Sequence, residues 1–75
     1  MLFFKSKYEK ELEYMLSELK NYLSNNYKDA AHTCREQISI LAEQYHKEGN
    51  ISDKVYRKYV DIYKHYTALM KDYHH

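Results

Sequence analysis

The sequence of 75 residues contains no proline, no tryptophan, one glycine and one cysteine. Hairpin turns and phosphate-binding loops depend on glycine and proline, so this composition favours helices joined by short turns. A single cysteine cannot form a disulfide within the chain. No apolar run approaches the about 20 residues that a membrane-spanning helix needs, so we expect no membrane segment. The sequence therefore predicts one all-α domain spanning residues 1–75.

An excess of charge of one sign is also missing. Twelve Lys and Arg residues against eleven Asp and Glu residues give a formal net charge of +1. Such a chain lacks the positive excess that drives binding to nucleic acid. The opening Met1-Leu2-Phe3-Phe4 is too short for the apolar core of a signal peptide. Together with the unpaired cysteine, these features predict a cytoplasmic protein.

Tyrosine is abundant, with ten residues in an apolar fraction of 44%. The mean hydropathy of −0.91 understates the capacity to form a core, because tyrosine counts as polar yet buries a large ring. A chain of this length buries only roughly 60% of its unfolded surface. Without disulfides, association with another chain is a common way to gain the missing burial. We therefore expect a homo-oligomer, as a dimer, or a complex with another protein.

Two polar segments, 24–26 and 49–52, divide the chain into three parts. Within each part apolar residues recur at alternating steps of three and four, which is typical of helices that pack on neighbours. We predict helices over about residues 6–24, 27–48 and 53–73. The expected core stripes are Tyr8, Leu12, Met15, Leu19 and Tyr22, then Tyr27, Ala31, Cys34, Ile38, Leu41 and Tyr45, and finally Val55, Tyr59, Ile62, Tyr66, Leu69 and Tyr73.

Helix-capping residues mark the expected helix ends. Ser6 followed by Glu9 forms a capping box, and Ser52 is the expected N-cap of the third helix. Asn26 is the expected N-cap of the second helix. Gly49 fits the left-handed position that follows a helix C-terminus. Short turns between similar helices predict an antiparallel, up-down-up three-helix bundle. The alternative is a helical hairpin that completes its core only as a dimer.

The turn over residues 25–31 is similar to the turn between the two helices of a tetratricopeptide repeat. The resemblance covers this turn alone. Ser17, Glu18, Asn21 and Gln37 stand where that repeat has leucine, glycine, tyrosine and alanine. We therefore assign the chain to no family.

The third helix carries more apolar residues than one core face needs. A second stripe with a seven-residue spacing runs beside its core stripe, and basic residues flank it. We predict that this face is an interaction surface formed by Tyr56, Val60, Tyr63, Met70, Arg57 and Lys64. The alternative is that the tyrosine rings lie along the edge of the bundle with their hydroxyls in water.

A basic line of Arg57, Lys64 and Lys71 runs beside these aromatic residues. Basic and aromatic side chains together can bind single-stranded nucleic acid, which is the alternative function. Glu11 and Glu18 form an acidic line with the same spacing on the first helix. The more favoured interpretation is that the two lines pair between the first and third helices, or are simply solvated.

The histidine, cysteine and acidic residues do not show the spacings that are typical of a metal site or a catalytic site. Glu43-x-x-His46 matches one arm of a di-iron site, but no second Glu-x-x-His follows. Cys34 lies within a core stripe, where a thiol is inert. We expect no catalytic residue, no metal and no cofactor. The sequence thus predicts a small, non-catalytic protein-interaction or assembly module that self-associates through the tyrosine-rich face of the third helix.

Overall fold

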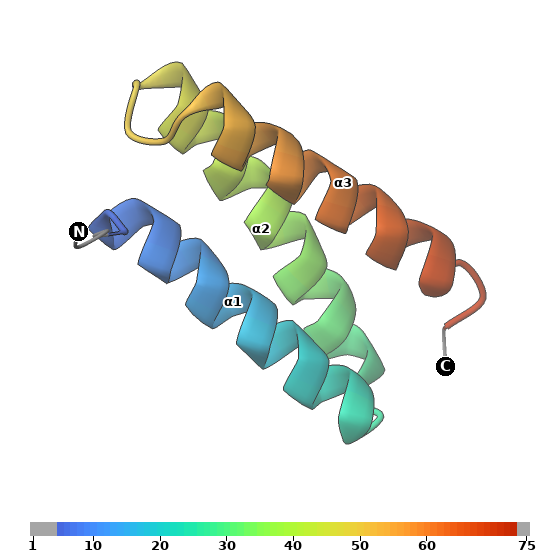
Figure 1. The fold of residues 1–75 in the computed structure, drawn as a ribbon. Coiled ribbons are helices and arrows are strands. Elements are labelled where there is room, and N and C mark those ends of the chain that lie inside the picture. The colour runs from blue at the N-terminus through green and yellow to red at the C-terminus, as the bar shows by residue number, and fades with distance from the viewer. Residues whose placement is uncertain (1–4, 74–75) are drawn as a thin grey trace.

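The computed structural model describes residues 5–73 and forms three helices (Figure 1). They are α1 (Lys7–Ser24), α2 (Lys28–Lys47) and α3 (Asp53–Leu69), with no strand in the described part of the chain. The all-α prediction is confirmed. The third helix ends four residues before the predicted boundary. The expectations placed on residues 1–4 lie outside the described residues.

Serine hydroxyls cap two of the helices as expected. The Oγ of Ser6 accepts a hydrogen bond of 3.1 Å from the backbone N–H of Glu9. The Oγ of Ser52 accepts one of the same length from the backbone N–H of Val55. Each bond satisfies an amide that the first turn of a helix leaves unpaired. These contacts fix the starts of α1 and α3.

Both turns use one residue with a left-handed backbone just after the preceding helix. Gly49 follows α2 with φ +76°, as predicted, and Asn26 follows α1 with φ +60°. In each turn the next amide bonds back over five residues, from Asn50 to the carbonyl of Tyr45 and from Tyr27 to the carbonyl of Tyr22. The prediction that Asn26 caps α2 is therefore wrong, because this residue terminates α1. Tyr27 precedes α2 and makes no side-chain cap.

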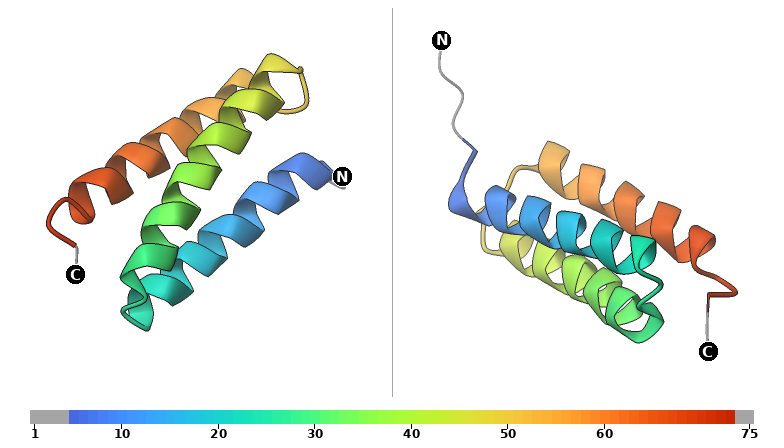
Figure 2. Two further views of the ribbon diagram at one scale, coloured as in Figure 1. Left: turned by 180° about the vertical axis from the view of Figure 1, so that it is seen from behind. Right: turned by 90° about the horizontal axis from the view of Figure 1, so that it is seen from below.

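The middle helix makes nearly all of the interhelical contacts. α2 packs on α1 and on α3, whereas α1 and α3 touch each other little. Figure 2 shows this arrangement from behind, where α2 lies in front of the space between the other two helices. The Tyr8 and Tyr45 rings meet at 4.9 Å between centroids, so the start of α1 lies beside the end of α2. The fold is built around α2.

The core lies mainly between α1 and α2. Burying apolar area is the main stabilising contribution to such a small fold. The buried residues are Leu12, Met15 and Leu19 from α1, Ala31, Cys34, Ile38 and Ala42 from α2, Tyr59 from α3, and Ile51 and Met70 from the segments flanking α3. Of the core stripe predicted for the third helix, only Tyr59 is buried.

The core side of α3 differs from the predicted one. Leu69, expected in the core, leaves 62% of its surface exposed, whereas Met70, expected on the outer face, is 2% exposed. The reason is that α3 packs chiefly on α2 and only slightly on α1. The side of α3 that carries Tyr56 and Tyr63 therefore meets α2, and part of the predicted stripe stays in solvent.

Candidate functional site

The predicted interaction stripe of α3 is largely engaged within the molecule. The Tyr56 ring stacks on the His46 ring of α2 at 4.2 Å between centroids and an interplanar angle of 6°. The Tyr63 hydroxyl donates a hydrogen bond of 3.1 Å to Glu36 Oε1 of α2. Met70 belongs to the core, so its assignment to an exposed surface is wrong. Helix α2 thus covers much of the surplus tyrosine face.

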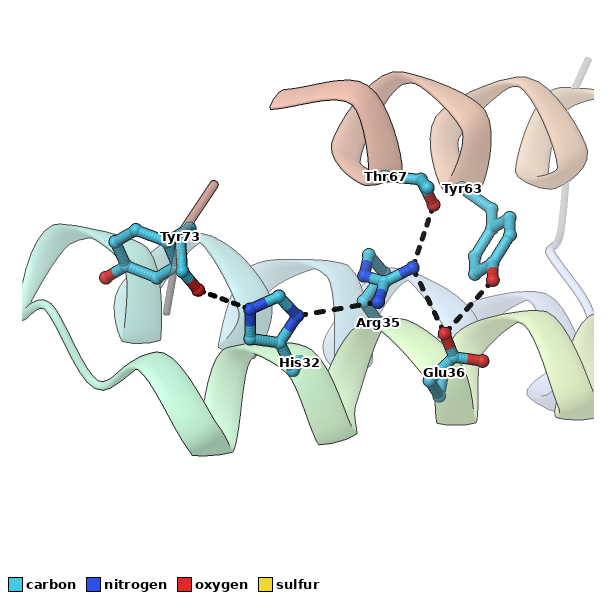
Figure 3. A network of polar contacts seen from close by, with 6 residues as sticks. All are labelled: His32, Arg35, Glu36, Tyr63, Thr67 and Tyr73. Atoms are coloured by element: carbon cyan, nitrogen blue, oxygen red, sulfur yellow. Dashed lines mark hydrogen bonds and ion pairs between the residues drawn. The ribbon is translucent and has the colours of Figure 1, made fainter. Parts of the chain in front are cut away.

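Arg35 is the centre of a polar network between α2 and α3 (Figure 3). Its guanidinium donates a hydrogen bond of 2.8 Å to Thr67 Oγ1 and pairs with Glu36 at 3.1 Å. The same group lies over the Tyr63 ring, 5.3 Å from the centroid. The Arg35 side chain is only 12% exposed, so these contacts operate in a partly desolvated environment. The network fixes the position of α3 along α2.

Tyr73 ties the chain that follows α3 back to the first turn. Its hydroxyl donates a hydrogen bond of 2.8 Å to Asn26 Oδ1. Its backbone carbonyl accepts a hydrogen bond from His32 Nε2, and Arg35 donates to His32 Nδ1 at 3.5 Å. Three hydrogen bonds therefore join Tyr73 to the region of Asn26, His32 and Arg35, which is distant in the sequence. This contact extends the polar network to the end of the described chain.

Three of the predicted surface residues remain on the outer side of α3. Arg57 and Lys64 are exposed, and Val60 between them is half-buried. Steps of three and four residues place the three side chains on one helical ridge, which we call the α3 ridge. Asp61 is exposed beside it. The α3 ridge is therefore basic, with one aliphatic residue at its centre.

A groove with a volume of about 390 Å³ runs between α1 and α2. Small side chains on α2 leave this space beside larger side chains on α1. It is lined by Met15, Glu18 and Tyr22 from α1 and by Asp29, Ala30, Thr33, Cys34 and Gln37 from α2. No lysine or arginine is among these residues, so we call the site the acidic groove.

The charge of Glu18 reaches into the acidic groove. It is the largest cause that raises the pKa of Tyr22 above its usual value. Burial, and secondarily Glu18, raise the pKa of the Cys34 thiol. The Tyr22 shift shows that the charge of Glu18 disfavours a negative group and favours a positive one nearby, whereas the burial that dominates the Cys34 shift disfavours charge of either sign. The site suits an apolar side chain that carries a cationic group.

The acidic groove is lined by one thiol, that of Cys34. Cys34 is buried, and its Sγ donates a hydrogen bond of 3.2 Å to the carbonyl of Met15. The raised pKa keeps this thiol protonated, which is the unreactive form. Within residues 5–73, no group of three or more His, Cys, Asp or Glu side chains is placed to hold a metal ion.

The two charged lines seen in the sequence do not meet within one molecule. Glu18 faces the acidic groove between α1 and α2, and Lys64 is exposed on α3. The ion pairs found among the described residues are Lys5–Glu13, Arg35–Glu36 and His46–Asp53. The expected pairing between the first and third helices is therefore absent from this set.

Sequence reasoning missed the acidic groove. Its signal was present in the small residues Ala30 and Cys34, which face the longer Met15 and Tyr22 side chains. Periodicity identifies which side of a helix is apolar, but it does not show whether facing side chains fill the space.

In the described part of the chain, no helix has both the length and the apolar character needed to cross a membrane. Comparisons with known protein families, with curated proteins and with solved structures found no match.

Proposed function

We propose that this chain is a non-catalytic protein-interaction module, an antiparallel, up-down-up three-helix bundle that binds a basic amphipathic helix in its acidic groove. The groove itself is the observation that carries the proposal. It combines apolar walls with two carboxylates, from Glu18 and Asp29, and is open to solvent. Helical partners commonly bind by placing apolar side chains into such a groove.

Exposed apolar residues near the groove support this proposal. Tyr14 on α1 is 63% exposed, and Ile40 on α2 is 55% exposed. At 100° per residue, Tyr14 lies 40° beyond Glu18 on the outer side of α1. Ile40 lies one turn from the groove residue Gln37 on α2. Aromatic and aliphatic residues around a groove widen the area that a partner can bury.

The nucleic-acid alternative has less support. Arg57, Lys64 and Lys71 are exposed. However, the Tyr56 ring stacks on His46, and the Tyr63 ring packs beneath Arg35. Bases could not stack on these rings without displacing contacts that hold α3 against α2. We therefore propose a protein partner.

The test uses a synthetic helix of leucine and lysine, about 18 residues long, with leucines at steps of three and four. We expect its addition to shift the backbone amide NMR signals of Met15, Tyr22 and Ala30. A helix with glutamate in place of lysine should produce no such shifts, because the acidic groove repels it.

A matched pair of variants locates the binding site. Ala30→Trp fills the acidic groove and should abolish the shifts. Ala68→Trp adds the same side chain at an exposed site on α3 and should leave them unchanged. Binding that persists in Ala30→Trp, or that shifts only signals from α3, would refute the proposal.

A further inference from the structure

We infer that the basic helix received by the acidic groove is α3 of a second copy of this chain, presented through its α3 ridge. This inference rests on the proposed function and names the partner. The receiving copy contributes Glu11, Glu18 and the apolar groove walls. The entering copy contributes Arg57, Val60 and Lys64.

The first argument is charge complementarity. The α3 ridge carries two exposed cations, and Glu18 lines the acidic groove, which has no lysine or arginine among its lining residues. Asp61, beside the ridge, offsets part of the positive charge. Two surfaces of opposite sign on one molecule attract each other between copies and steer the encounter.

The second argument is a matched spacing. Glu11 and Glu18 are seven residues apart on α1, and Arg57 and Lys64 are seven residues apart on α3. Seven residues of α-helix span about 10.5 Å, so two pairs of opposite charges can align at the same time. Within one molecule Glu18 faces the acidic groove and Lys64 lies on the outer side of α3. Two copies bring these lines together.

The third argument concerns what enters the groove. Val60 lies between the two cations on the ridge and is only half-buried within its own chain. It can pack against Met15, which lies between Glu11 and Glu18 on α1, while Arg57 and Lys64 extend to these two acids. Arginine and lysine also have apolar stems that cover such walls. The adjacent tyrosines keep their contacts with α2, so docking needs no rearrangement.

The expected association is weak. A contact of two helical turns is smaller than the interface of a standard stable complex, which buries about 800 Å² on each partner. We therefore expect sedimentation analysis of the whole chain to show a rise in mass only near about 1 mM. The rise should diminish as salt increases, because the opposing charges are screened.

The decisive experiment reverses charges on each side separately. One variant carries Arg57→Glu with Lys64→Glu, and the other carries Glu11→Lys with Glu18→Lys. Each variant alone should associate about tenfold more weakly than the wild type, since like charges then face one another. An equimolar mixture should restore association, because each variant supplies the surface that the other lacks.

A control for the variant with Arg57→Glu and Lys64→Glu replaces Lys20 and Lys54 by glutamate, which changes the net charge by the same amount. Both residues are exposed, and neither is part of the α3 ridge or the acidic groove. This variant should associate as the wild type does. Circular dichroism confirms that each variant keeps its helices.

Three results would overturn the inference. One is a wild type that stays monomeric up to about 1 mM. Another is a mixture of the two charge-reversed variants that does not associate. The last is association that leaves the amide signals of Ala30 and Thr33 unchanged. If a monomeric wild type still binds the leucine–lysine helix in its groove, the proposed function stands and self-recognition is refuted.

Discussion

Helix α2 meets its two neighbours in different ways. Towards α1 it presents Ala31, Cys34 and Ile38, all buried. Towards α3 it presents Arg35, Glu36 and His46, which make hydrogen bonds, an ion pair with Asp53 and a ring stack with Tyr56. The first interface is held by the burial of apolar surface, which needs no specific angle. The second adds directional contacts to the burial of Tyr59, so the position of α3 is also set by geometry.

The difference suggests an order of stability. Apolar burial is lost only when the two helices separate, whereas the polar contacts of α3 compete with water at their exposed ends. We therefore expect α1 and α2 to form the more stable pair. α3 should open first. Substitutions at each interface and in the two turns test this comparison, beginning with the largest expected effect.

Leu12→Ala should break the α1–α2 interface. Leu12 is fully buried, so truncation loses transfer free energy and leaves a cavity. We expect a loss of about 2–5 kcal/mol in the free energy of unfolding, measured by guanidinium denaturation. The control is Leu69→Ala, which removes the same atoms from a side chain that is 62% exposed. Its effect should stay within about 0.5 kcal/mol. Equal effects would contradict the assigned core.

Arg35→Leu should break the α2–α3 interface while keeping an apolar stem. On α3 it removes the hydrogen bond to Thr67 and the contact with the Tyr63 ring. Within α2 it removes the bond to His32 and the ion pair with Glu36. We expect a loss of about 1–2 kcal/mol, and faster amide hydrogen exchange in α3 than in α1. Arg57→Leu, at an exposed site, serves as the control. Uniformly faster exchange in all three helices would argue against a separable α3.

Tyr59→Phe should stabilise the protein. Tyr59 is 1% exposed, and its hydroxyl has no hydrogen-bond partner among the described residues. Removing a buried hydroxyl without a partner avoids its desolvation cost, so we expect a gain of up to about 1 kcal/mol. A loss of stability in guanidinium denaturation would show that the hydroxyl makes a favourable contact.

The same tyrosine predicts a dependence on alkaline pH. Burial raises the pKa of Tyr59 to about 12, from an ordinary value of 10.0. The folded state therefore retains a proton that the unfolded state loses between these values. Below pH 10 the hydroxyl is neutral in both states and gives no pH dependence, and stability falls as the pH rises from 10 towards 12 because unfolding then releases the proton. Tyr59→Phe should lose less stability than the wild type over this range in guanidinium denaturation.

The two turns provide the smallest test. Gly49→Ala should cost about 1 kcal/mol, because alanine is strained at a φ of +76° although its Cβ would meet nothing within 4 Å. In a protein that already carries Tyr73→Phe, Asn26→Gly should raise the free energy of unfolding by a few tenths of a kcal/mol. When Asn26→Gly is made in the wild type, this gain is offset because the hydrogen bond from the Tyr73 hydroxyl is lost. Thermal denaturation of the variants measures both effects.

Sequence patterns predicted the α1–α2 side of this comparison far better than the α3 side. Leu12, Leu19 and Ile38 are buried as expected, and the serine caps are confirmed. Tyr27 is an exception, because it precedes α2 and is 59% exposed although a core position was predicted for it. These features depend on local spacing and on residue types with strong preferences. An apolar stripe along a helix is enough to predict which side of that helix is buried when it packs by apolar burial.

The position of α3 was not predictable in the same way. Two apolar stripes compete on this helix, and periodicity gives them equal weight. The choice between them depends on contacts across long sequence separations, such as Tyr63 with Glu36 and Arg35 with Thr67. Met70 was misplaced because the side of α3 that meets α2 is the one that carries Tyr56 and Tyr63, and Met70 follows Tyr63 by seven residues. The acidic groove was missed because it depends on how facing side chains fill space.

The burial of Cys34 has a practical consequence. Its thiol is 9% exposed and its pKa is raised, so alkylating reagents react with it slowly in the closed molecule. Separation of α1 from α2 frees the sulfur, so the alkylation rate reports how often the two helices part. The chain has one cysteine, so each modified molecule records one such event. Cys34 is therefore a built-in reporter of the transient separation of α1 from α2, the interface that we expect to open last.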